Sequence, residues 1–194
     1  MPAVRFNFPL FLTWLRIVAI PLFVAVLYVP EDWIAEKSRN VISMWIFIGA
    51  AVTDWADGYL ARKWNQTTSF GAFLDPVADK LMVAAALIVL TEFGRIYALV
   101  ALIIIGREIT VSALREWMAQ IGQSKSVAVN MAGKAKTVAQ LVAIPFLLFD
   151  DVLFGLFHTR PVGHVLIGGA AGITLLSMVV YLKGALAAPS PPGE

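Results

Sequence analysis

Residues 10–29 read LFLTWLRIVAIPLFVAVLYV, an apolar stretch in which Arg16 is the only charged residue. A helix of about 20 residues is long enough to cross the roughly 30 Å hydrocarbon core of a bilayer. The stretch is longer than the apolar part of a secretory signal and lacks a clear small-residue cleavage site. We therefore expect a retained transmembrane helix here.

Similar apolar stretches recur along the rest of the chain, separated by turn residues and charges. They occupy residues 41–60, 73–91, 96–117, 127–149 and 162–186. The sequence thus predicts an all-α integral membrane protein with six transmembrane helices. We expect one domain over residues 1–186 and a disordered tail at 187–194.

The composition agrees with a membrane location. Hydrophobic residues make up 59% of the chain and charged residues 14%, whereas soluble domains average about 25% charged residues. With no cysteine and only two histidines, the chain has neither a disulfide framework nor a Cys- or His-rich metal site. A net charge of +2 with scattered basic residues does not indicate nucleic-acid binding. Lys and Arg are more frequent at the two termini and in the second and fourth loops than in the other loops, which predicts that both termini are cytoplasmic.

Four aspartates cluster where the second predicted helix ends and the third begins. Asp54 and Asp57 lie one turn apart on the second helix, and Asp75 and Asp79 lie one turn apart on the third. Small residues share these faces: Gly58, Ala61 and Gly71. Because the connection is short, we expect antiparallel neighbouring helices that turn the acidic faces toward each other.

Carboxylates gathered in this way need neutralisation. At about 6 Å and an effective dielectric of 20, each pair repels by roughly 3 kcal/mol. Protonation, Arg or Lys partners, or divalent cations would relieve this repulsion, and oxygen ligands suit Mg²⁺ or Mn²⁺. Two such cations form a clamp for displacement at phosphorus. Alternatively, these acids are solvated at helix ends or paired with Arg62 and Lys80.

The spacing of these residues resembles a known family signature. The run from Asp54 to Arg62, followed by Gly71, Asp75 and Asp79, matches D-x-x-D-G-x-x-A-R-x8-G-x-x-x-D-x-x-x-D of the CDP-alcohol phosphotransferase family. The likeness extends through residues 7–16, 70–80, 107–109, 112–117, 126–129 and 133–137. Within the family, the chain is similar to bacterial members that use CDP-diacylglycerol and glycerol 3-phosphate.

The resemblance implies roles for particular residues. Two divalent cations, Mg²⁺ or Mn²⁺, would be held by Asp54, Asp57, Asp75 and Asp79. The cytidine diphosphate pocket would be lined by Thr53, Gly58, Ala61, Arg62 and Gly71. Asp79 would accept the proton of the sn-1 hydroxyl of glycerol 3-phosphate, whose oxygen attacks the lipid-side phosphorus of CDP-diacylglycerol, and cytidine monophosphate would leave. The site would face the cytoplasm from the bacterial inner membrane, among its lipids.

The phosphate of the acceptor requires fixed cations, and basic residues occur in the later apolar helices. The candidates are Arg107, Arg115, Lys134 and Lys136. Lys134 and Lys136 are 200° apart on a helix, so we expect only one of them to point inward. For Arg115 and the lysines, the alternative is snorkelling to lipid headgroups; for Arg107 it is pairing with Glu108.

Other features leave alternatives open. Asn7, Thr13 and Arg16 fit helix capping or headgroup contact as well as substrate binding. We treat His158 and His164, on the predicted outer side, as structural. The small residues at 168–172 suit either a homodimer interface or the bundle interior.

Two other functions compete with this prediction. The signature also fits transfer to serine, inositol phosphate or a second phospholipid. A divalent-cation transporter would likewise carry acids on two helices, but its site should lie near the membrane midplane. Here the acids start close to the charged cytoplasmic loop, which favours an enzyme.

Overall fold

The protein is helical, and six helices confirm the predicted element count. The computed structural model describes residues 8–64, 69–120 and 131–186, with side chains except at 8–10, 55, 57–64, 69, 72, 131–135 and 180–186. The helices are α1 (Phe8–Tyr28), α2 (Glu36–Trp64), α3 (Ser69–Glu92), α4 (Ala98–Gln120), α5 (Met131–Phe149) and α6 (Thr159–Leu186). The tail predicted at 187–194 lies outside the described residues.

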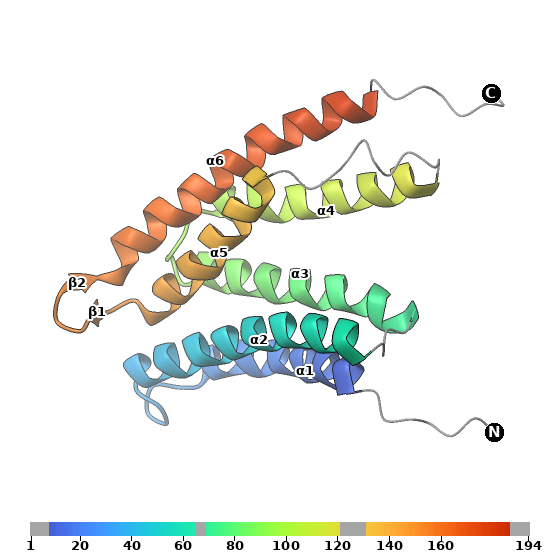
Figure 1. Cartoon of the computed structure of the whole chain (residues 1–194). Helices are drawn as coiled ribbons and strands as arrows, with labels where there is room; N and C mark the ends of the chain where they lie inside the picture. The colour runs from blue at the N-terminus through green and yellow to red at the C-terminus, as the bar shows by residue number, and fades with distance from the viewer. Residues whose placement is uncertain (1–7, 65–68, 121–130, 187–194) are drawn as a thin grey trace, which may run out of the picture.

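The helices pack as a bundle in which the start of α1 and the end of α6 lie at the same end (Figure 1). Helix α1 packs against both α2 and α3, and α5 runs obliquely between α6 and α2, contacting both. Direct contact between α2 and α3 is limited among the described residues. The two acid-bearing helices are therefore joined mainly through α1, whereas we expected them to pack directly on each other.

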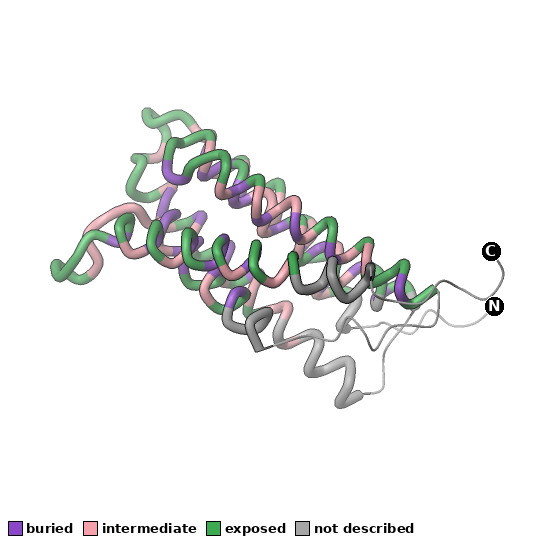
Figure 2. Tube along the Cα trace, turned by 90° about the horizontal axis from the view of Figure 1, so that it is seen from above, coloured by how far each residue is buried: buried purple, intermediate pink, exposed green. Residues whose placement is uncertain are grey.

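Apolar residues fill the bundle and also cover its outside. Phe23, Phe47, Leu87 and Ile144 are fully buried between helices, and buried positions alternate with exposed ones along the helices (Figure 2). Large apolar side chains are nevertheless exposed on the outer faces, for example Leu102 and Leu176. A contiguous apolar exterior of this kind is typical of a surface that faces lipid.

Two of the described helical stretches are both long and apolar enough to cross a membrane. They are Phe11–Tyr28 and Thr159–Val179, and a shorter apolar helical stretch covers Lys136–Phe149. The other helices carry charged or polar residues that lower their hydropathy, notably in α2.

A short hairpin closes the end of the bundle opposite the chain termini (Figure 1). Strand β1 (Val152–Leu153) pairs antiparallel with β2 (Phe157–His158), and the turn places Phe154 and Gly155 at positive φ, 51° and 72°. Glycine adopts this conformation without steric cost, which explains Gly155 at the tip. The sequence pattern did not predict this hairpin.

Arg95 ties several elements together at the same end. This buried side chain donates hydrogen bonds to the carbonyl of Leu148 and to Asn40 Oδ1, both at 2.8 Å, and pairs with Asp150. His164 Nε2 lies 2.7 Å from the Arg95 carbonyl oxygen. The network joins α2, the α3–α4 connection, α5 and α6, which agrees with a structural role for His164.

The small residues at 168–172 divide between the two sides of α6. Ala170 and Ala171 are buried, whereas a Cβ added at Gly168, Gly169 or Gly172 would meet nothing within 4 Å. The close helix approach is instead at Gly163, where an added Cβ would lie 2.6 Å from Leu147 Cγ.

Candidate active site

Helix α1 supplies partners to two of the predicted acids. Arg16 Nη1 lies 2.7 Å from Asp54 Oδ1 on α2, and Thr13 Oγ1 donates a hydrogen bond of 2.5 Å to Asp75 Oδ1 on α3. Thr13 and Arg16 are almost completely buried and stand one turn apart, so both point from the same side of α1. This arrangement explains how α1 brings the acidic faces of α2 and α3 together.

The described acids form one electrostatic cluster. Asp54 interacts through space with Asp75 and Arg16, and Asp79 interacts with Asp54 and Glu108. Among the side chains that the structure describes, no three acidic or histidine groups are placed to hold a metal ion together. The fourth acid, Asp57, lies on α2 where side chains are not described.

The donor chemistry of the cluster fits hard divalent cations. Asp54 and Asp75 each use one oxygen, Oδ1, in the contact with α1. A carboxylate has two oxygens and about four lone-pair positions, so each retains capacity for a further ligand. Oxygen ligands of this type suit Mg²⁺ or Mn²⁺.

Two buried basic side chains, on α4 and α5, share the carboxylate of Glu108. Arg107 and Lys136 are 6% and 2% exposed. Arg107 Nη1 lies 3.4 Å from Glu108 Oε1, and Lys136 Nζ forms an ion pair with the same oxygen. A contact of Arg107 with Glu108 was expected as one of two alternatives; the link of Glu108 to Lys136 was not foreseen. Arg107 also donates to Ser177 Oγ on α6 at 3.4 Å.

Of the two lysines, Lys136 is described and points inward. Lys134 lies where α5 side chains are not described. Arg115, further along α4, is exposed and still takes part in an interaction.

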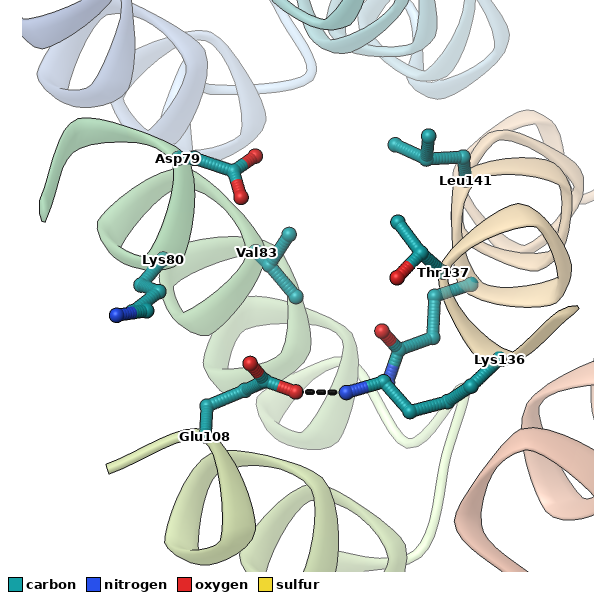
Figure 3. Close-up of a pocket in the computed structure, with 8 residues that line it drawn as sticks. Asp79, Lys80, Val83, Glu108, Lys136, Thr137 and Leu141 are labelled. Carbon is teal, nitrogen blue, oxygen red and sulfur yellow. Dashed lines mark hydrogen bonds and ion pairs between the residues drawn. The ribbon is translucent and has the colours of Figure 1, made fainter. Parts of the chain in front are cut away.

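A cavity of about 50 Å³ is lined by Asp79 and by the Glu108–Lys136 ion pair. Figure 3 shows Asp79 at one end of it and the Glu108–Lys136 pair at the other. Its walls come from α3, α4 and α5, and its lining residues are Asp79, Lys80, Val83, Glu108, Lys136, Thr137, Gln140 and Leu141. The cavity has room for small polar groups, since a single water needs about 10–15 Å³ of such space.

A second cavity, of about 120 Å³, adjoins the first between α3 and α4. Lys80, Val83 and Glu108 line both cavities, and the remaining walls of the second are apolar, including Leu81 and Ile104. Polar and apolar compartments therefore meet at Glu108 and Lys80.

The residues predicted for the nucleotide pocket are only partly described. Thr53 Oγ1 donates to the carbonyl of Ala50 in its own helix at 2.8 Å, and Gly71 is buried. The side-chain positions of three others lie outside the described part of the chain: Gly58, Ala61 and Arg62.

Sequence reasoning gave little weight to Thr13 and Arg16 and did not single out Gln140. An arginine in an otherwise apolar helix is a signal for a buried partner, and Gln140 is likewise a lone amide in an apolar stretch of α5. The partners themselves are distant in sequence, so spacing does not reveal them.

Comparison with known proteins places this arrangement in context. The family described as CDP-alcohol phosphatidyltransferase matches residues 6–185. The chain is 48% identical over 185 residues to the CDP-diacylglycerol--glycerol-3-phosphate 3-phosphatidyltransferase of Escherichia coli (strain K12), covering 94% of this chain and 97% of that protein. It is also 48% identical over 183 residues to the protein of the same name from Salmonella typhimurium (strain LT2), covering 93% and 96%.

Proposed function

The chain belongs to the CDP-alcohol phosphatidyltransferase family, and we propose that it transfers the phosphatidyl group of CDP-diacylglycerol to the sn-1 hydroxyl of glycerol 3-phosphate. The names of its relatives support this reaction. One structural observation carries the proposal: Asp79 and the buried Lys136 line a single cavity. A base for a hydroxyl and a cation for a phosphate are what this acceptor requires at its two ends.

The proposed reaction takes place at the cytoplasmic surface of the bacterial inner membrane. We propose that all six helices span the membrane and that both termini are cytoplasmic. The apolar exterior and the two long apolar helices support the membrane location. Asp54 lies in the second half of α2, and Asp75 and Asp79 lie in the first half of α3. The end of α2 and the start of α3 lie at the end of the bundle at which α1 begins (Figure 1).

Asp54, Asp57, Asp75 and Asp79 are proposed to hold two divalent cations, Mg²⁺ or Mn²⁺. Bound there, the cations would bind the pyrophosphate oxygens of the donor and stabilise the charge that develops on them. Arg16 and Thr13 orient the carboxylates of Asp54 and Asp75. Thr53, Gly58, Ala61, Arg62 and Gly71 are proposed to bind the cytidine diphosphate group.

Asp79 is proposed as the general base. It lines the cavity, and the structure shows no hydrogen bond or ion pair from its carboxylate to another described side chain. The sn-1 hydroxyl gives its proton to this carboxylate while its oxygen forms a bond to the lipid-side phosphorus. The bond from that phosphorus to cytidine monophosphate breaks, so no covalent intermediate on the protein is needed.

Lys136 and Arg107 are proposed to bind the acceptor phosphate, with Arg115 and Lys134 as further candidates. Glu108 keeps the Lys136 ammonium in place and neutralises it until a phosphate arrives. A dianionic phosphate interacts with Lys136 and Arg107 more strongly than the Glu108 carboxylate does, because arginine binds phosphate oxygens with two N–H groups.

An acceptor panel tests the proposal. Purified protein with CDP-diacylglycerol should release cytidine monophosphate with glycerol 3-phosphate, but not with serine or inositol phosphate. Asp79→Asn should lower kcat by at least about 100-fold, the usual contribution of a general base. Asp32→Asn, in the exposed connection between α1 and α2, is the matched control and should retain activity. Release with serine alone would reject the acceptor assignment.

The transporter alternative is tested with the same preparation. Protein reconstituted in liposomes should not move Mn²⁺ across the bilayer in the absence of lipid substrate. Cation flux abolished by Asp79→Asn, without nucleotide release, would reject the enzyme proposal.

A further inference from the structure

Gln140 is a buried amide in the wall of the same cavity. It lies one turn after Lys136 on α5, and the two side chains are 5% and 2% exposed. Residues four apart on a helix share a face, and both residues line the cavity together with Asp79. Gln140 therefore belongs to the compartment between the proposed base and the proposed phosphate cation.

The Gln140 amide group lacks the partner that its burial calls for. Nε2 is buried and has no hydrogen-bond acceptor within the described ranges of the chain. Buried polar groups in folded proteins are nearly always paired. The buried amide of Asn40, at the opposite end of the bundle, illustrates the rule, because its Oδ1 accepts a hydrogen bond from Arg95. An unpaired donor that faces a cavity is suited to a ligand oxygen.

The structure of the acceptor identifies that oxygen, because Asp79, Lys136 and Gln140 line one cavity. In the proposed reaction the sn-1 hydroxyl lies at Asp79 and the phosphate at Lys136, so the carbon between them carries the sn-2 hydroxyl. We propose that Gln140 Nε2 donates a hydrogen bond to the sn-2 oxygen of glycerol 3-phosphate and thereby selects an acceptor with a hydroxyl at that position. This inference rests on the proposed function and adds the group that reads the middle of the acceptor.

The test compares two acceptors on the purified full-length protein with CDP-diacylglycerol. One is glycerol 3-phosphate, and the other is 3-hydroxypropyl phosphate, which lacks only the sn-2 hydroxyl. The unmodified protein should prefer the first by about 10- to 100-fold in kcat/KM, because a site built to bind a hydroxyl rejects the analogue that lacks it. In Gln140→Met, which keeps the length of the side chain but has no donor, the two values should agree within about threefold.

Two further measurements separate this role from a structural one. Gln120→Leu, at the exposed end of α4, is the matched control and should keep the preference of the unmodified protein. The ligand-free thermal stability of Gln140→Met should equal or exceed that of the unmodified protein, since replacing an unpaired buried amide by an apolar group removes no internal hydrogen bond. Gln140→Leu, a second variant without a donor, should show the same loss of acceptor preference and the same retained thermal stability.

The outcomes are distinguishable. An unmodified protein that is active but treats the two acceptors alike would overturn the role of Gln140 and leave the proposed function standing. An equal loss with both acceptors in Gln140→Met would also overturn it, since this indicates contact with the phosphate or a purely structural role. Absence of activity with either acceptor in the unmodified protein would overturn the proposed function and this inference together.

Discussion

Replacing Arg95 with leucine should strongly destabilise the protein, although Arg95 lies at the opposite end of the bundle from the acids. The Arg95 side chain is 4% exposed, and its Nε lies 3.3 Å from Asp150 Oδ2. It also donates hydrogen bonds to Asn40 and to the carbonyls of Leu147 and Leu148. Burial lowers the pKa of the guanidinium, while Asp150 and Glu36 oppose that shift. A guanidinium stays protonated in proteins, so the substitution removes a buried charge.

The expected magnitude follows from what the substitution leaves behind. Removing one partner of a buried ion pair costs about 3–5 kcal/mol, because the other charge stays buried. Asp150, whose side chain is 16% exposed, keeps its second partner Arg160 at 3.4 Å, which favours the lower part of that range. For a chain of this length 1 kcal/mol shifts Tm by about 2–4 °C, so the expected loss is roughly 6–12 °C.

Thermal unfolding in detergent micelles measures this loss, and Arg160→Leu is the matched control. Arg160 pairs with the same carboxylate but is 44% exposed, and exposed ion pairs contribute only about 0–1 kcal/mol. Its substitution should lower Tm by less than about 4 °C. Equal shifts in the two variants, or a shift below about 2 °C for Arg95→Leu, would show that burial does not set the strength of this network.

Three further predictions concern other contacts. Thr13→Val removes the hydroxyl that donates to Asp75 and should lower kcat/KM by about tenfold or more. The control is Thr110→Val, because the Thr110 hydroxyl donates to the Gly106 carbonyl within α4; kcat/KM should not fall in this variant. Equal losses in the two variants would contradict a role of Thr13 in orienting Asp75. Gly163→Ala places a Cβ against Leu147 and should destabilise the fold by about 1–3 kcal/mol in thermal unfolding, whereas Gly169→Ala, with open space around it, should be neutral. The Lys37 ammonium and the Val152 N–H hold the pKa of Asp151 below its ordinary value. The Asp151 carboxylate therefore stabilises the fold at neutral pH, and this stabilisation is lost as pH falls through the lowered pKa. When the free energy of unfolding is measured between about pH 7 and pH 3, it should depend less on pH in Asp151→Asn than in the unmodified protein.

The helices were predictable because apolar stretches of membrane length dominate the sequence. The ends of the helices were harder to predict. Helix α2 begins at Glu36 rather than at residue 41, because its first turns carry polar residues that hydropathy cannot assign to a helix. A glutamate suits the positive end of the helix dipole, and Asn40 is held by Arg95. The hairpin escaped prediction because two-residue strands leave no alternating pattern.

The candidate site was predictable in its residue types but not in its pairing. Helical spacing placed Asp54, Asp75 and Asp79 on inward faces, and the contact of Arg107 with its neighbour Glu108 was among the expected possibilities. Spacing within one helix, however, carries no information about contacts between helices. For this reason the sequence did not reveal that Arg16 and Thr13 reach the acids, or that Lys136 shares Glu108 with Arg107.

The two ends of the bundle differ in how far their polar and charged side chains are paired within the chain. At the hairpin end, Arg95, Asp150 and Asn40 satisfy one another within the chain. At the acidic end, Asp79 and the Gln140 amide face a cavity, and Asp54 and Asp75 each retain a free oxygen after their contact with α1. Unpaired buried groups weaken a fold, so the paired groups around Arg95 contribute stability that offsets the unpaired groups at the acidic end. Variants at the acidic end that remove polar groups should therefore lose activity before they lose stability, the reverse of what Arg95→Leu should do.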